Sequence, residues 1–197
     1  MKAQARAWMG LSTELFLKAL DSVEDPALDE PCALPGWTRK HLVAHVHFNA
    51  LALGRLTHWA ATGHQTPMYA SGEQRRAEIA DGARLPSAEL RALARQSAVA
   101  LPAAFDDLDE VGWAREIVTI QGRRLPATAL PWLRTREAAV HAVDLRAGVH
   151  FDDLPEDLLL ALAGDVLARR AMAGELAGIT GWLTGRSPDA PAIGPWL

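Results

Sequence analysis

Hydrophobic and polar residues recur along most of this chain with the period of an α-helix. Between residues 3 and 22, Ala7, Leu11, Leu15 and Ala19 fall in one row, and the pattern stops at Asp25 and Pro26. Comparable patterns predict further helices at residues 39 to about 61, 73–81, from 87 onward, about 128–147, 156–173 and 176–183. The chain is therefore expected to be mainly α-helical.

Local signals add helix ends and one short β segment. Thr38 is suited to cap the helix that begins at residue 39, and Gly148 is expected to end the helix that begins near residue 128. Between Trp113 and Leu125, a β-branched run from residue 116 to 120 precedes a Gln-Gly turn, which predicts a small hairpin. The expected fold is a four-helix bundle over residues 1–150, with this hairpin and a short helical extension over residues 151–197.

Composition excludes several classes of protein. The 20 Lys and Arg residues against 24 Asp and Glu give a net charge of −4, and no basic cluster suggests nucleic-acid binding. No apolar run reaches the roughly 18 residues of a membrane span, and the N-terminus does not resemble a signal peptide. A single cysteine, Cys32, excludes an internal disulfide, and no activating partner is evident for it as a nucleophile. We therefore expect a soluble, cytoplasmic protein.

The residues with the clearest chemical potential are Glu137 and His141. They are four positions apart in a predicted helix, so their side chains lie on one face, about 5 to 6 Å apart at Cβ. A carboxylate and an imidazole in this arrangement can bind one metal ion, and His45 on the second helix is the best candidate for a third ligand. Two His and one carboxylate would leave positions on a zinc ion open for chemistry.

Each ligand also has an ordinary interpretation. A Glu and a His at this spacing can simply stabilise a helix, and a lone His in an amphipathic helix is commonly a surface or core residue. His41 competes with His45, although its position in the first helical turn favours exposure. Asp144 and Asn49 are candidates for supporting the ligands from a second shell, and Asp144 could equally be a surface acid.

An anionic substrate would require cationic partners. Arg75 or Arg76, which follow a loop at residues 66–72, and Arg186, in a Gly-bounded turn, are the arginines selected, although many arginines are only solvated. Tyr69, in the same loop, is a candidate for substrate binding.

Several motifs occur in order over about residues 1–160: Leu34-Pro35-Gly36-Trp37-Thr38, Leu42-Val43-Ala44-His45, Trp59-Ala60-Ala61-Thr62-Gly63, Pro67-Met68-Tyr69-Ala70-Ser71, Leu130-Pro131-Trp132-Leu133-Arg134 and the segment from Arg136 to Leu145. Together they resemble the mycothiol-dependent maleylpyruvate isomerases of the DinB-like superfamily. Trp182-Leu183-Thr184-Gly185-Arg186 matches the ending of the family's chains. The segment between Arg170 and Gly181 departs from the family, because it has room for a helix only, and this indicates a shortened C-terminal domain.

The resemblance implies a DinB-like bundle with one divalent ion, usually zinc, bound by His45, Glu137 and His141. It further implies a low-molecular-weight thiol, mycothiol in the family, as the second cofactor. The implied reaction converts maleylpyruvate to fumarylpyruvate by thiolate addition, rotation about the resulting single bond and elimination, as in aromatic degradation. Arg75 and Arg186 would be the catalytic arginines, and the protein would be a monomer or a homodimer.

Three other functions are compatible with the same residues. A thiol S-transferase would consume the thiol, whereas an isomerase regenerates it. A zinc hydrolase would need no thiol, because water would take its place. A non-catalytic DinB-like protein would keep the bundle without turnover.

Overall fold

The computed structural model describes residues 2–194. These residues form two compact units, and the boundary between them in the sequence lies between His150 and Phe151. Each unit is described separately below.

The first unit contains four long helices and several short elements. Its helices are α1 (Lys2–Ser22), α2 (Arg39–Thr62), α3 (Gly72–Gly82), α4 (Ser87–Asp106), α5 (Glu110–Ala114) and α6 (Leu130–Asp144), with 3₁₀ turns at Pro26–Asp29 and Ala127–Ala129. Pro102 lies inside α4. The predicted helices are thus present, while the short α5 was not anticipated.

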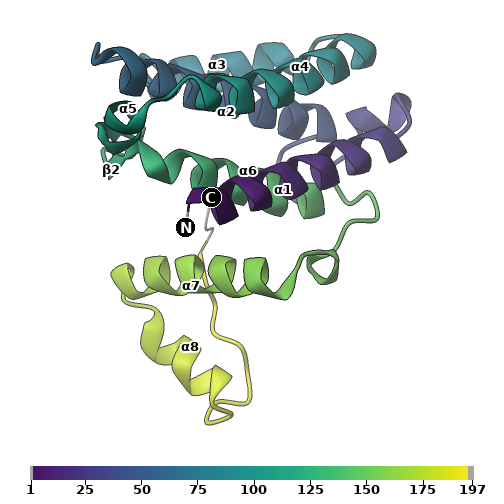
Figure 1. The fold of residues 1–197 in the computed structure, drawn as a ribbon. Coiled ribbons are helices and arrows are strands. Elements are labelled where there is room, and N and C mark those ends of the chain that lie inside the picture. Colours follow the sequence, from purple (N-terminus) through teal and green to yellow (C-terminus); the bar gives the residue numbers. More distant parts are fainter. Residues whose placement is uncertain (1, 195–197) are drawn as a thin grey trace. The chain divides into compact units, whose positions relative to one another are not determined.

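The four long helices pack as a bundle around two clusters of buried apolar residues. Within this unit α1 packs on α6, α2 packs on α4, and α2 also contacts α6 (Figure 1). The largest side chains that are fully buried include Phe16, Leu42, Leu56 and Phe105. The predicted four-helix bundle is confirmed, and it brings α2 and α6, the helices of the candidate ligands, together.

Helix α3 packs on α2, and a glycine makes this contact close. A Cβ atom at Gly82 would lie 2.8 Å from Cβ of Ala44 and 2.9 Å from a ring carbon of Phe48, which is too close for any larger residue without movement. Ala44 immediately precedes His45. The packing therefore places the face of α3 near the candidate metal ligand.

The beginning of α2 is fixed by its own residues and by the end of α6. The Thr38 hydroxyl accepts a hydrogen bond from the His41 amide, and the His41 ring accepts one from the Thr38 amide, which forms a capping box. The Arg39 side chain donates to the Leu145 carbonyl at 2.7 Å. This last bond satisfies a carbonyl at the end of α6 and holds the two helix ends together.

Two details differ from expectation at the end of α6. The helix ends at Asp144, before the predicted residue 147, and Gly148 is not its terminating glycine. The left-handed residue that follows the helix is Arg146, with φ of 52°. The prediction was wrong because hydrogen bonds from Arg39 to Leu145 and from the Ala33 amide to the Asp144 carbonyl end the helix earlier.

The predicted hairpin is present between α5 and α6. Strand β1 (Glu116–Val118) pairs antiparallel with β2 (Arg124–Pro126), and Ile117 lies opposite Leu125. Ile117 is fully buried, so the hairpin is anchored on the core of the bundle.

The second unit contains a 3₁₀ turn (Phe151–Asp153), helix α7 (Glu156–Met172) and helix α8 (Leu176–Leu183). Arg170 on α7 donates to Glu175 and to the carbonyl of Gly194, which ties the last described residues to the helix. Up to residue 194 this unit contains no strand. Among the residues that the structure describes, no helix is long and apolar enough to cross a membrane.

Candidate metal centre

Three potential ligands converge between α2 and α6. Nε2 of His45 lies 3.0 Å from Oε2 of Glu137, and Nε2 of His141 lies 3.5 Å from the same oxygen. One donor atom from each residue falls within 4.8 Å of the other two. His45 and His141 are buried, whereas Glu137 is partly exposed, so Glu137 is the residue of the three that is most open to solvent.

The donor atoms suit a metal ion. Nε2 of His141 is buried and has no hydrogen-bond partner among the described residues, and its 3.5 Å separation from Glu137 exceeds an ordinary hydrogen bond. A buried polar atom without a partner is costly, and a cation between the three residues would satisfy it. Two imidazole nitrogens and one carboxylate oxygen form a ligand set typical of zinc, with a position left for another ligand.

Asp144 supports this arrangement by contacting the other ring nitrogen of His141. Its carboxylate lies 2.8 Å from Nδ1 of His141. A carboxylate only accepts hydrogen bonds, so Nδ1 carries the proton and the lone pair of Nε2 faces Glu137. The contact that the sequence suggested for Asp144 is therefore present.

The charges of the three residues reflect burial and their mutual contacts. Burial lowers the pKa of His45 and outweighs the opposing effect of Glu137. Burial alone would raise the pKa of Glu137, but the two neighbouring imidazoles, His141 and His45, hold it well below its usual value. Burial would also lower the pKa of His141, yet Asp144 and Glu137 raise it. Glu137 is therefore an anion, as a metal ligand must be.

Of the two neighbouring arginines, Arg75 faces the cluster. Its guanidinium lies 3.2 Å from Nδ1 of His45, and it is partly buried on α3. Arg76 is exposed, and its guanidinium lies beside Gly72 at the start of the same helix. The structure thus separates two residues that the sequence could not.

Arg134 was not selected from the sequence, yet it is part of the same region. It is 3% exposed, and its Nη1 donates to the Val46 carbonyl at 2.7 Å and to Oδ1 of Asn49 at 3.2 Å. Burial lowers the pKa of Arg134 to about 10, and the charge of Glu137, one turn further along α6, opposes that shift. Asn49 therefore holds Arg134 and makes no hydrogen bond with the three ligands.

Trp37 also has a role that the sequence did not reveal. Its ring packs edge-on against His45 with 5.6 Å between ring centroids, so it limits how that imidazole can turn. His41 contributes to the helix cap, as described above.

The remaining histidines lie outside the cluster. His47 is buried and pairs with Ser97 at 3.0 Å, while His58, His64 and His150 are exposed. Burial raises the pKa of the Cys32 thiol, which argues against a reactive thiolate. Arg186 is an exposed residue of the second unit and donates to the carbonyl of Thr184.

Tyr69 is buried in the loop between α2 and α3, with Arg55 over its ring at 5.9 Å. Its hydroxyl makes no hydrogen bond within the described part of the chain. Burial raises the pKa of Tyr69 to about 12, while Arg75 opposes the shift and Glu137 adds to it. The phenol is therefore neutral, and its pKa depends in part on the charges of Arg75 and Glu137.

Comparison with known proteins agrees with this geometry. Residues 10–146 match the family described as the mycothiol maleylpyruvate isomerase N-terminal domain. The chain belongs to this family. A crystal structure of the mycothiol-dependent maleylpyruvate isomerase is similar, with 41% sequence identity and a TM-score of 0.83 over 85% of this chain and 70% of that one. A histidine-to-alanine mutant of that isomerase gives a TM-score of 0.82 with the same identity and coverage.

A more distant structure supports the fold alone. YfiT from Bacillus subtilis, described as a probable metal-dependent hydrolase with an unusual four-helix bundle topology, is 16% identical. Its TM-score is 0.58, and the match covers 73% of this chain and 85% of that one. A search of curated proteins found no match. The family assignment made from the sequence motifs is confirmed, and it is a family of enzymes.

Proposed function

We propose that this protein is a metal- and thiol-dependent cis-trans isomerase that converts maleylpyruvate to fumarylpyruvate. The observation that carries the proposal is the convergence of His45, Glu137 and His141, with Arg75 beside them, in a chain that is 41% identical to a mycothiol-dependent maleylpyruvate isomerase. The metal is proposed to be zinc, because imidazole and carboxylate ligands with an open position suit it. The thiol is proposed to be mycothiol.

Together, the metal and the thiol would supply an activated nucleophile. A metal ion held by His45, Glu137 and His141 would favour the thiolate form of a bound thiol at neutral pH, and this nucleophile could add reversibly to the cis double bond and so allow rotation. The protein residues hold the ligands and the substrate around this chemistry. His45, Glu137 and His141 fix the metal, and Asp144 fixes the orientation of His141.

The cationic residues determine where an anionic substrate lies. Arg75 is placed to bind a substrate carboxylate and to stabilise negative charge that develops on the substrate during addition. The neutral hydroxyl of Tyr69 can donate a hydrogen bond to the same substrate, because no described residue already accepts it. Arg186 is proposed as a second catalytic arginine, and Arg76 as a contact at the rim.

The test is the rate of maleylpyruvate isomerisation by zinc-loaded protein with mycothiol, glutathione, cysteine or no thiol. We expect turnover with mycothiol, no net loss of thiol, and no turnover without one. Stoichiometric loss of thiol would instead indicate a thiol S-transferase, and hydrolysis without thiol would indicate a hydrolase. Inactivity under all four conditions, with zinc bound, would reject the proposal.

Two variants examine the ligands directly. His45→Ala and His141→Ala are each expected to lose both zinc and activity while keeping a helical circular dichroism spectrum. His64→Ala is the matched control, since His64 is exposed and outside the cluster. Full zinc retention in both cluster variants would show that the ligands lie elsewhere.

A further inference from the structure

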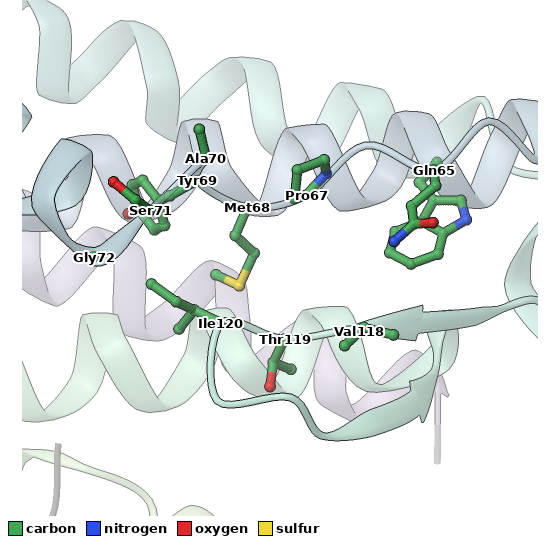
Figure 2. Close-up of a pocket in the computed structure, with 11 residues that line it drawn as sticks. Gln65, Pro67, Met68, Tyr69, Ala70, Ser71, Gly72, Val118, Thr119 and Ile120 are labelled. Carbon is green, nitrogen blue, oxygen red and sulfur yellow. The ribbon is translucent and has the colours of Figure 1, made fainter.

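A cavity of about 270 Å³ opens between the loop that follows α2 and the hairpin (Figure 2). Figure 2 shows Met68 reaching from the loop toward Ile120 on the hairpin side. The lining residues come from α2, the loop and the hairpin: Trp59, Gln65, residues 67–72 and residues 118–120. None of them carries a charged side chain.

The loop side of the cavity is fixed by hydrogen bonds. Arg55 donates to the Met68 carbonyl at 2.6 Å, and the Ala70 amide donates to Oε1 of Gln74 at 2.7 Å. The Ser71 hydroxyl caps α3 by accepting from the Gln74 amide at 3.0 Å. The cavity is therefore formed before any ligand arrives, which reduces the ordering cost of binding.

The chemistry of the lining defines what can bind. Trp59, Met68, Val118 and Ile120 offer apolar surface, and Gln65 adds a side-chain amide with hydrogen-bonding groups. A charged group would enter without an ionic partner here, which is unfavourable. The volume lies below the roughly 300 to 1,000 Å³ of typical ligand pockets, so the cavity suits part of a ligand.

The first turn of α3 connects this cavity to the candidate metal centre. Ser71 and Gly72 line the cavity, and one helical turn further along the Arg75 amide donates to the Ser71 carbonyl at 3.2 Å. The Arg75 guanidinium lies 3.2 Å from Nδ1 of His45. A ligand with its reactive end at the metal centre could therefore extend past the start of α3 into the cavity.

We propose that this cavity is a subsite for a neutral, partly apolar arm of a ligand whose reactive end lies at the His45, Glu137 and His141 cluster. The inference rests on the proposed function for that reactive end. The arm is that of the thiol, because maleylpyruvate carries a carboxylate at each end and a carboxylate would be unfavourable in this uncharged cavity.

The test fills the cavity and compares binding with catalysis. Ile120→Trp adds bulk at the cavity, where Ile120 is 41% exposed, so folding should be preserved. Val111→Trp is the control, because Val111 is an equally β-branched, 64% exposed residue of α5 that does not line the cavity. Binding of benzyl alcohol and of methyl glucoside to the zinc-loaded protein is followed by chemical-shift changes at the Thr119 and Ala70 amides.

We expect at least one neutral probe to shift these amides in the native protein and in Val111→Trp, and at least tenfold weaker binding to Ile120→Trp. A rise in KM for mycothiol but not for cysteine in Ile120→Trp would assign the arm to the thiol. A rise in KM for maleylpyruvate alone would overturn the assignment of the arm to the thiol.

The probe measurement keeps this inference separate from the proposed function. Probe binding that is lost in Ile120→Trp, in a protein without isomerase activity, would support a binding cavity and reject the isomerase. Absence of probe binding, together with unchanged KM values in Ile120→Trp, would overturn the inference even if the isomerase is active.

Discussion

The carboxylate of Asp144 accepts a hydrogen bond from Nδ1 of His141 at 2.8 Å, at the point where α6 ends. This contact selects the tautomer of His141 in which Nε2 has a free lone pair directed at Glu137. Asp144, which is not itself a proposed ligand, thereby leaves Nε2 of His141 available to bind a metal ion.

Replacing Asp144 should weaken metal binding without unfolding the bundle. We expect Asp144→Ala to reduce zinc affinity by roughly 10- to 100-fold, the usual effect of removing such a supporting group. Asp144→Asn keeps an acceptor oxygen and should lose less. Competition with a zinc-binding dye measures both, and Asp81→Ala, at an exposed ion pair with Arg84, is the control. Equal zinc affinity in Asp144→Ala and the control would refute this role.

The sequence could predict half of this site because the relevant information is local. Glu137 and His141 share one helix, and helical periodicity fixes their relative direction. His45 is 92 residues away from Glu137, so its pairing depends on how α2 packs on α6. The position of His41 in the first helical turn favoured His45 over it, but the sequence could not establish this contact.

Other features required the packed structure. Arg75 and Arg76 are adjacent, and which one faces His45 depends on the close contact of α3 with α2 at Gly82. An arginine is usually exposed, so Arg134 would ordinarily be assigned to the surface. It lies three residues before Glu137 and seven before His141, however, which places it on the helix face of these ligands. This spacing could have identified it from the sequence. The cavity could not be predicted, because a loop and a hairpin far apart in the sequence form it.

Arg75 should affect metal binding and turnover in opposite directions. Its guanidinium is 3.2 Å from Nδ1 of His45, where a positive charge disfavours a cation on the same imidazole. We expect Arg75→Met to bind zinc more tightly and yet to isomerise maleylpyruvate roughly 100-fold more slowly, because charge on the substrate loses its partner.

The matched control for this prediction is Arg76→Met, the same substitution at the exposed neighbour. Its zinc affinity and its kcat should stay close to those of the native protein. If Arg75→Met lost zinc and activity in parallel, Arg75 would support the structure of the centre instead of acting on the substrate.

Arg134 should couple α6 to α2 through Asn49. Arg134→Met leaves the Val46 carbonyl and the Asn49 side chain without their donor, and we expect a loss of about 1 to 3 kcal/mol in the free energy of unfolding. Asn49→Ala alone should cost less. In the double variant the loss should be smaller than the sum of the two, because the interaction is removed only once. Urea denaturation of the four proteins measures this coupling, and strict additivity would contradict it.

Tyr69 is the only tyrosine in the chain, so its ionisation can be followed without interference from another phenol. Burial raises the pKa of Tyr69 to about 12, whereas an unfolded tyrosine ionises near pH 10. Because the folded pKa is the higher one, the stability contribution is complete below about pH 10 and is lost as the pH rises toward 12. Tyrosinate difference absorbance of metal-free protein should therefore stay flat through about pH 10 and rise above it. In urea the midpoint should fall to about 10, and Tyr69→Phe should give no signal. A midpoint near 10 in the folded protein would mean that the phenol is solvated, and Tyr69 would then not be the buried, neutral donor proposed for the substrate.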